Sequence, residues 1–150
     1  MRFATDATLG KLGRQLRAAG FDTLCQHQSR CGDFFGTIDP QRIILTRTTA
    51  VRLNFQHHPL VFIRDNNPLQ QMMQVVRSLD VKRNDLKPFT RCLACNTDII
   101  PVDRDVIRGQ VPDYVWQRHR AFHQCHLCRR IYWAGSHHER MGNQLEAVFK

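Results

Sequence analysis

The sequence has no stretch of about 18 consecutive apolar residues, which is the length that a membrane-spanning helix needs. Its first residues, Met1 to Asp6, lack the apolar core of a signal peptide. Internal repeats and low-complexity tracts are also absent. We therefore expect a soluble protein of the cytoplasm, a compartment in which cysteines stay reduced, with no membrane contact.

Acidic residues are few in comparison with basic ones. Asp and Glu number 13 against 22 Lys and Arg, which gives a formal net charge of +9 and a pI near 9.9. Such an excess favours a polyanionic partner, most often a nucleic acid. Arginine dominates the basic residues, and its planar guanidinium suits phosphate better than an ammonium group does. The alternative is a solvated basic surface that only keeps the protein soluble.

Cysteine is also scarce, but four of the six cysteines form two Cys-x-x-Cys pairs. These are Cys92 with Cys95 and Cys125 with Cys128. Two such turns that face each other place four sulfurs in a tetrahedron, the arrangement of closed structural zinc sites. One pair alone is compatible with a redox motif or a disulfide, whereas two pairs in a cytosolic protein favour metal binding. We predict one structural Zn²⁺ held by these four thiolates.

The residues that follow the two pairs differ in how well they suit a tight turn. Asn96 follows the first pair, and asparagine tolerates the left-handed backbone conformation that closes such a turn. Arg129 holds the equivalent place after the second pair and suits it less well.

The spacing of apolar residues predicts strands that alternate with helices in the first half of the chain. We expect strands at residues 2–5, 21–25, 42–46 and 60–63, and helices at 9–19, 48–55 and 68–79. This alternation predicts an α/β fold with a mostly parallel sheet flanked by helices. In the second half we expect strands at 99–102 and 130–133 and a short helix that begins near Pro112.

A polar segment that contains Pro88 separates the two halves. We therefore predict an α/β domain at residues 1–80, a linker at 81–90, and a small four-cysteine zinc ribbon with a C-terminal tail at 91–150.

Three aspartates occupy positions near the ends of the expected strands. Asp6 and Asp65 each follow a strand, and Asp33 lies on the element after the second strand. Ligands of parallel α/β sheets bind beyond the carboxyl ends of the strands, where these acids would gather. Gathered carboxylates repel one another unless a hard cation such as Mg²⁺ or Mn²⁺ neutralises them, and such an ion can activate water for attack on phosphate. A single aspartate at a strand end is, however, more often a helix cap or a turn residue.

Motifs along nearly the whole chain match one family pattern. They are Phe3-x-x-Asp6-x-x-Leu9-Gly10-Lys11-Leu12, Gly20-Phe21-Asp22-Thr23, Ile44-Leu45-Thr46-Arg47, Arg91-Cys92-Leu93-x-Cys95-Asn96, Phe122-x-x-Cys125-x-x-Cys128 and Tyr132-Trp133-x-Gly135-Ser136-His137. This set resembles the Mut-7 C-terminal ribonuclease domain family. The resemblance implies a PIN-like nuclease domain followed by a zinc ribbon. It also implies a metal-dependent ribonuclease or RNA-processing protein that hydrolyses RNA phosphodiester bonds.

The same resemblance assigns roles to individual acids. Asp6 matches the first acid of the family and Asp33 the second, and Asp65 is a candidate for a further acid. The third acid is expected directly after Thr46-Arg47, where this sequence has Thr48. Because threonine carries no charge to anchor a divalent cation, a non-catalytic RNA-binding protein with a degenerate acidic centre is the alternative. A protein-interaction adaptor whose ribbon binds a partner chain is a third option.

Basic residues near both predicted centres are candidates for contact with RNA phosphates. We assign this role to Lys11, Arg14, Arg47, Arg118, Arg129 and Arg130.

Overall fold

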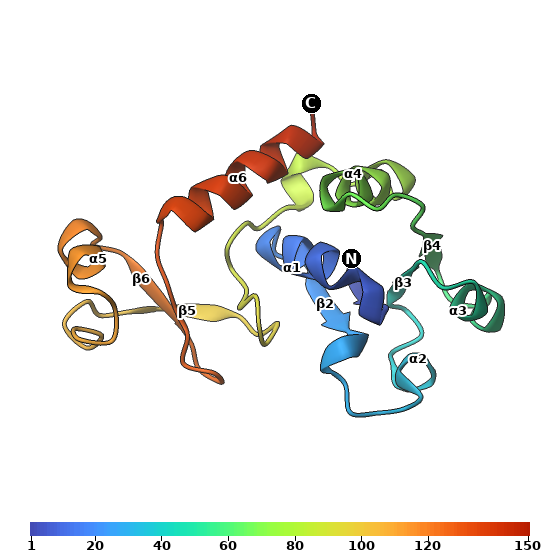
Figure 1. The fold of residues 1–150 in the computed structure, drawn as a ribbon, viewed down its shortest axis with the longest axis horizontal. Helices are drawn as coiled ribbons and strands as arrows, with labels where there is room; N and C mark the ends of the chain where they lie inside the picture. Colours follow the sequence, from blue (N-terminus) through green and yellow to red (C-terminus); the bar gives the residue numbers. More distant parts are fainter.

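The computed structural model describes residues 1–150, and the first half of the chain contains a four-stranded parallel sheet (Figure 1). The strands are β1 (Arg2–Thr5), β2 (Asp22–Cys25), β3 (Ile43–Thr46) and β4 (Leu60–Phe62). Their order in the sheet is β2-β1-β3-β4, and Thr5 is paired with both Cys25 and Leu45. Because all four strands run in one direction, the residues that follow them share one edge of the sheet. The expected α/β fold with a parallel sheet flanked by helices is confirmed.

Helices cover both faces of this sheet. Successive side chains of a strand point to opposite faces, so neighbouring residues of β1 pack against different helices. Phe3 of β1 faces the main core, against α1 (Gly10–Ala18), α4 (Pro68–Ser78) and α6 (Ser136–Val148). Ala4 faces a smaller core with Phe34 and Phe35 of α2 (Phe34–Thr37), and Val51 of α3 (Thr49–Asn54) packs against it.

Local sequence signals explain where the two longer helices of the first half begin and end. Asn67 caps α4 by accepting hydrogen bonds from two backbone amides, and Pro68 occupies its first turn. After α1, Gly20 adopts a φ of 96° and lies so close to the Lys87 carbonyl that a Cβ would stand 2.2 Å from its oxygen. The segment around Lys87 therefore packs against the end of α1.

The longest helix, α6, lies at the C-terminus and packs against α1 and α4 (Figure 1). Leu145 and Val148 belong to the main core, and the Arg83 guanidinium donates to the Glu146 carboxylate at 2.5 Å. Arg83 also lies over the Phe149 ring, 5.3 Å from its centroid. The apolar spacing of the sequence predicted only a tail here.

At each of the two outer strands of the sheet, β4 and β2, a side-chain amide forms hydrogen bonds with backbone groups. At β4, the Gln74 side chain accepts from the Arg64 amide at 3.0 Å and donates to the Phe62 carbonyl at 2.8 Å. At β2, the Asn96 side chain accepts from the Thr23 amide at 2.9 Å. These contacts occupy backbone groups that would otherwise be open to pairing with another chain.

The second half of the chain forms a small antiparallel sheet with its own core. Its strands are β5 (Ile99–Val102), β6 (Phe122–Cys125) and β7 (Ile131–Tyr132), and the short helix α5 (Asp113–Arg118) precedes β6. The core consists of Ile107, Val111, Val115 and Phe122. No helix of the structure is both long enough and apolar enough to cross a membrane.

Candidate functional site

Asp6 lies directly after β1, in the middle of the carboxyl edge of the sheet, and is only 1% exposed. Its Oδ1 accepts from the Thr8 amide at 2.9 Å and from the Thr8 hydroxyl at 2.6 Å. Its Oδ2 accepts from the Thr46 hydroxyl at 2.6 Å and from the Arg47 amide at 2.7 Å. The carboxylate therefore joins the ends of β1 and β3.

Thr48 supplies a fifth donor to the same carboxylate. Its hydroxyl lies 3.3 Å from Asp6 Oδ2, and its amide donates to the Thr46 hydroxyl at 3.0 Å. Position 48, where the family resemblance leads us to expect an acid, thus faces Asp6. In this chain a neutral hydroxyl takes the place of a second carboxylate.

These contacts keep Asp6 ionised. Burial by itself raises the pKa of Asp6, but the hydrogen bonds from Thr46, Thr8 and the Arg47 amide outweigh it and leave the pKa below its ordinary value. An ionised carboxylate offers about four lone-pair positions, and five donors already approach them.

The other two predicted acids make local contacts of their own. Asp33 is exposed and caps α2 by accepting from the Gly36 amide at 3.2 Å. Asp65 is exposed and accepts from the Asn67 amide at 2.7 Å. Both contacts are of the helix-cap or turn type.

As they stand, the three acids do not fit a preformed Mg²⁺ or Mn²⁺ site. Among His, Cys, Asp and Glu, the one group of three or more residues whose ligand atoms all lie within 4.8 Å of one another consists of the four cysteines. Asp6 has its oxygens occupied by donors, and the three aspartates do not form a group whose carboxylate oxygens all lie within 4.8 Å of one another. A divalent ion at Asp6 has to displace hydroxyl donors.

The four cysteines do fit a zinc ion. Cys92, Cys95, Cys125 and Cys128 are free thiols, and their sulfurs lie within 4.8 Å of one another. The sulfurs of Cys92 and Cys128 are 3.7 Å apart, and a tetrahedral site with zinc–sulfur bonds of about 2.3 Å has sulfur–sulfur edges of about 3.8 Å.

Both cysteine turns have the same backbone conformation. The Asn96 amide donates to the Cys92 carbonyl, and the Arg129 amide donates to the Cys125 carbonyl. Asn96 and Arg129 adopt left-handed φ values of 65° and 64°. The turn therefore imposes this conformation on Arg129 although arginine is poorly suited to it.

Hydroxyl groups that the sequence analysis did not identify adjoin the sulfurs. The Tyr132 hydroxyl lies 3.1 Å from Cys92 Sγ and accepts from the Leu93 amide, and the Thr97 hydroxyl lies 3.2 Å from Cys125 Sγ. These contacts depend on how the strands of the small sheet pair, so the spacing of the cysteines gives no signal of them. They orient the ligands in the way that outer groups of a metal site do.

The thiols also differ in acidity. Burial raises the pKa of Cys125, but hydrogen bonds from Thr97 and from the Cys128 and Leu127 amides outweigh it and lower this pKa to about 6. Burial, together with the neighbouring Cys128 and Cys92, raises the pKa of Cys95 to about 12. Because a zinc ligand must be deprotonated, a cation is needed to hold all four thiolates together.

The predicted RNA-binding residues lie on the surface of both halves. The Arg47 guanidinium donates to the Asn66 side chain and thereby links the ends of β3 and β4. The remaining predicted residues are exposed, on α1, α5 and the second cysteine turn; they are Lys11, Arg14, Arg118, Arg129 and Arg130.

A polar hollow beside β4 adds two arginines that the sequence analysis did not single out. The hollow has a volume of about 320 Å³ and is lined by six polar residues, Arg64, Asp65, Gln70, Gln74, Arg77 and Ser78. Neither Arg64 nor Arg77 forms an ion pair. Residues 70, 74, 77 and 78 share one polar face of α4, a spacing that a search for a polar helical face could have found.

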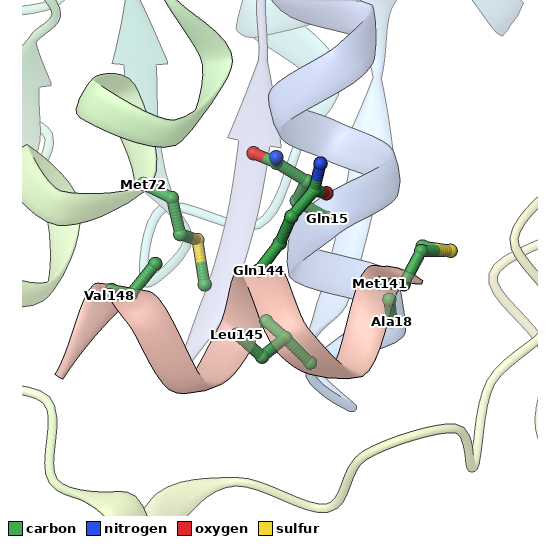
Figure 2. A pocket seen from close by; sticks show the side chains of 7 residues that line it. All are labelled: Gln15, Ala18, Met72, Met141, Gln144, Leu145 and Val148. Carbon is green, nitrogen blue, oxygen red and sulfur yellow. The ribbon is translucent and has the colours of Figure 1, made fainter. Parts of the chain in front are cut away.

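A second cavity lies where α6 meets α1 and α4 (Figure 2). Figure 2 shows Gln15 and Gln144 beside the apolar side chains of Met72, Leu145 and Val148. Its volume of about 10 Å³ suits about one water molecule, so it is a packing defect and not a substrate site.

Comparison with known proteins gives one match, to a family model. No curated protein and no solved structure matches the chain. The family model described as the Mut7-C RNAse domain matches residues 1–145 of the 150 residues, which include Asp6, Thr48 and all four cysteines. The chain belongs to the Mut7-C RNAse domain family.

Proposed function

We propose that this protein acts on RNA in the cytoplasm, where it binds the phosphate backbone through arginines and hydrolyses phosphodiester bonds slowly at Asp6. The observation that supports this proposal most directly is the pairing of Asp6 with position 48 at the ends of β1 and β3, in a chain of a ribonuclease family. The zinc ribbon has a structural role in the proposal.

The distribution of positive charge supports RNA as the partner. Arg47 follows β3 and Arg64 follows β4, so both lie at the same edge of the parallel sheet as Asp6. Arg77 lies on α4 and lines the same hollow as Arg64. An RNA strand that passes Asp6 meets this row of guanidinium groups, which suit phosphate oxygens.

The hydrogen bonds that already occupy the Asp6 carboxylate indicate the rate of RNA cleavage that we expect. A divalent ion binds there only by displacing hydroxyl donors such as those of Thr46 and Thr48, and without the second carboxylate it gains little charge compensation. We therefore expect slow cleavage that needs millimolar Mg²⁺ or Mn²⁺, with Mn²⁺ as the better ion.

One observation favours a second candidate, a non-catalytic RNA-binding protein. Five donors satisfy the Asp6 carboxylate without any metal, as they would in a purely structural role. The two candidates share RNA binding and differ in metal-dependent cleavage, for which the variants Thr48→Asp and Asp6→Asn are the test.

RNA binding is tested with the double variant Arg64→Gln/Arg77→Gln on a generic single-stranded RNA. Each phosphate contact that is lost reduces the slope of log affinity against log salt concentration by about 0.7. We therefore expect the double variant to bind the RNA more weakly and with a shallower salt dependence than the wild type. The control is Arg140→Gln on α6, which also removes an exposed positive charge. A wild-type affinity that does not respond to salt, or no binding to RNA, would favour a protein-interaction adaptor.

A further inference from the structure

Arg17 of α1 is the largest fully buried side chain of the chain, with an exposed fraction of 2%. It lies between α1 and the first cysteine turn, which belongs to the other half of the protein. Burial of a charged group costs several kcal/mol unless hydrogen bonds and an opposite charge compensate it.

Hydrogen bonds satisfy every N–H group of the Arg17 guanidinium. Its Nε and Nη2 donate to the Thr23 carbonyl at 2.9 and 2.8 Å, and Nη2 also donates to the Gln28 side chain at 2.8 Å. Its Nη1 donates to the carbonyls of Leu93 and Ala94 at 2.9 and 3.0 Å. Guanidinium has five N–H donors, so none is left free.

All of these acceptors are neutral, and Arg17 has no carboxylate partner. The acid of the adjacent strand, Asp22, instead accepts from the Arg42 guanidinium at 2.8 Å and from the Asn96 side-chain amide at 2.7 Å. The hydrogen bonds are therefore complete, but the charge lacks a compensating partner among the carboxylates.

The cysteine centre can supply that opposite charge. Leu93 and Ala94 are the two residues between Cys92 and Cys95, so the guanidinium holds the backbone of the first zinc-binding turn. A zinc ion with four thiolate ligands carries a formal charge of about −2. With the carbonyls held by Arg17, the Cys95 amide donates to Cys92 Sγ at 3.3 Å.

We infer that Arg17 is a component of the zinc centre, as its counter-charge and as the residue that positions its first turn, so that zinc binding and docking of the two halves are coupled. Gln28 supports the same contact, since it accepts from Arg17 and donates to the Ala94 carbonyl at 3.2 Å. Thermodynamic linkage requires that docking of the two halves strengthens zinc binding by the same factor by which zinc binding strengthens docking. The inference is independent of the proposed RNA function.

Zinc affinity of the full-length protein, measured by competition with a chelator in the absence of RNA, tests this coupling. Arg17→Met removes the charge at similar volume and is expected to weaken zinc binding at least tenfold. Arg17→Lys keeps the charge and is expected to bind zinc more tightly than Arg17→Met. The matched control Arg14→Met changes an exposed arginine of the same helix and leaves zinc affinity unchanged.

Equal zinc affinities of the wild type and Arg17→Met, or of the Lys and Met variants, would overturn the inference. If Arg17→Met does not fold, amide hydrogen exchange of the wild-type protein is decisive. Removal of zinc should speed exchange of the Thr23 amide, which donates to Asn96, more than that of the Ile44 amide, which donates to Pro59. Unchanged protection at Thr23 would contradict the coupling.

Discussion

At Asp6, five hydrogen-bond donors from the ends of two strands converge on one carboxylate. The position of Asp6 was predictable, because a buried strand ends just before it. The donors were not, because Thr46 and Thr48 are about forty residues away and reach Asp6 only through the pairing of β1 with β3. Sequence pattern thus locates the acid, whereas its chemical state depends on tertiary contacts.

Asp6→Asn is expected to lower the free energy of unfolding by about 2–3 kcal/mol at neutral pH, because an amide replaces a charged acceptor of several hydrogen bonds. The folded-state pKa of Asp6 lies below its ordinary value of 3.8, so its contribution is complete above that value and disappears as the pH falls through the folded-state pKa. Urea unfolding of the wild type and of Asp6→Asn at pH 7 and at pH 3 measures this contribution as the difference in their free energies of unfolding. A difference of the same size at both pH values would contradict the prediction.

Among the elements, α6 forms the main connection between the end of the chain and the α/β core. This helix was not predicted because its buried positions, Leu145 and Val148, stand among polar residues, so that apolar spacing gives a weak signal. The strand β3 was predictable because it begins with three consecutive apolar residues and is almost wholly buried, whereas β1 is short and only half apolar. Strand β6 was missed because two polar residues separate Phe122 from Cys125.

Leu145→Ala is expected to destabilise the protein by about 2–5 kcal/mol, the usual range for a leucine deleted from a core. Leu145 is 7% exposed and belongs to the main core, whereas Leu53, the control position, is 56% exposed. Leu53→Ala should change stability by no more than about 0.5 kcal/mol. Denaturant unfolding compares the two variants, and similar losses of stability would show that α6 does not support the core.

On the scale of the whole molecule, the two halves meet through buried polar contacts as well as through α6. Arg17, Gln28 and Asn96 connect the first cysteine turn with α1 and β2. Gln26, two residues before Gln28, accepts from the Ala7 amide next to Asp6. The short segment after β2 therefore contacts both the backbone next to Asp6 and the first cysteine turn. The sequence pattern picks out Asp6 and the four cysteines separately, but no local pattern predicts the contacts that connect the two regions.

The most direct test of the central claim is the rate at which purified protein cleaves a generic single-stranded RNA over a series of Mn²⁺ concentrations. Thr48→Asp places a second carboxylate beside Asp6 and should raise the rate and lower the metal concentration required. Thr49→Asp, which adds the same charge one residue further along, serves as the control and should leave both unchanged. Asp6→Asn should abolish cleavage and retain RNA binding, because it removes no positive charge. If Thr48→Asp behaves like the wild type and Asp6→Asn cleaves equally well, Asp6 is not the centre of hydrolysis.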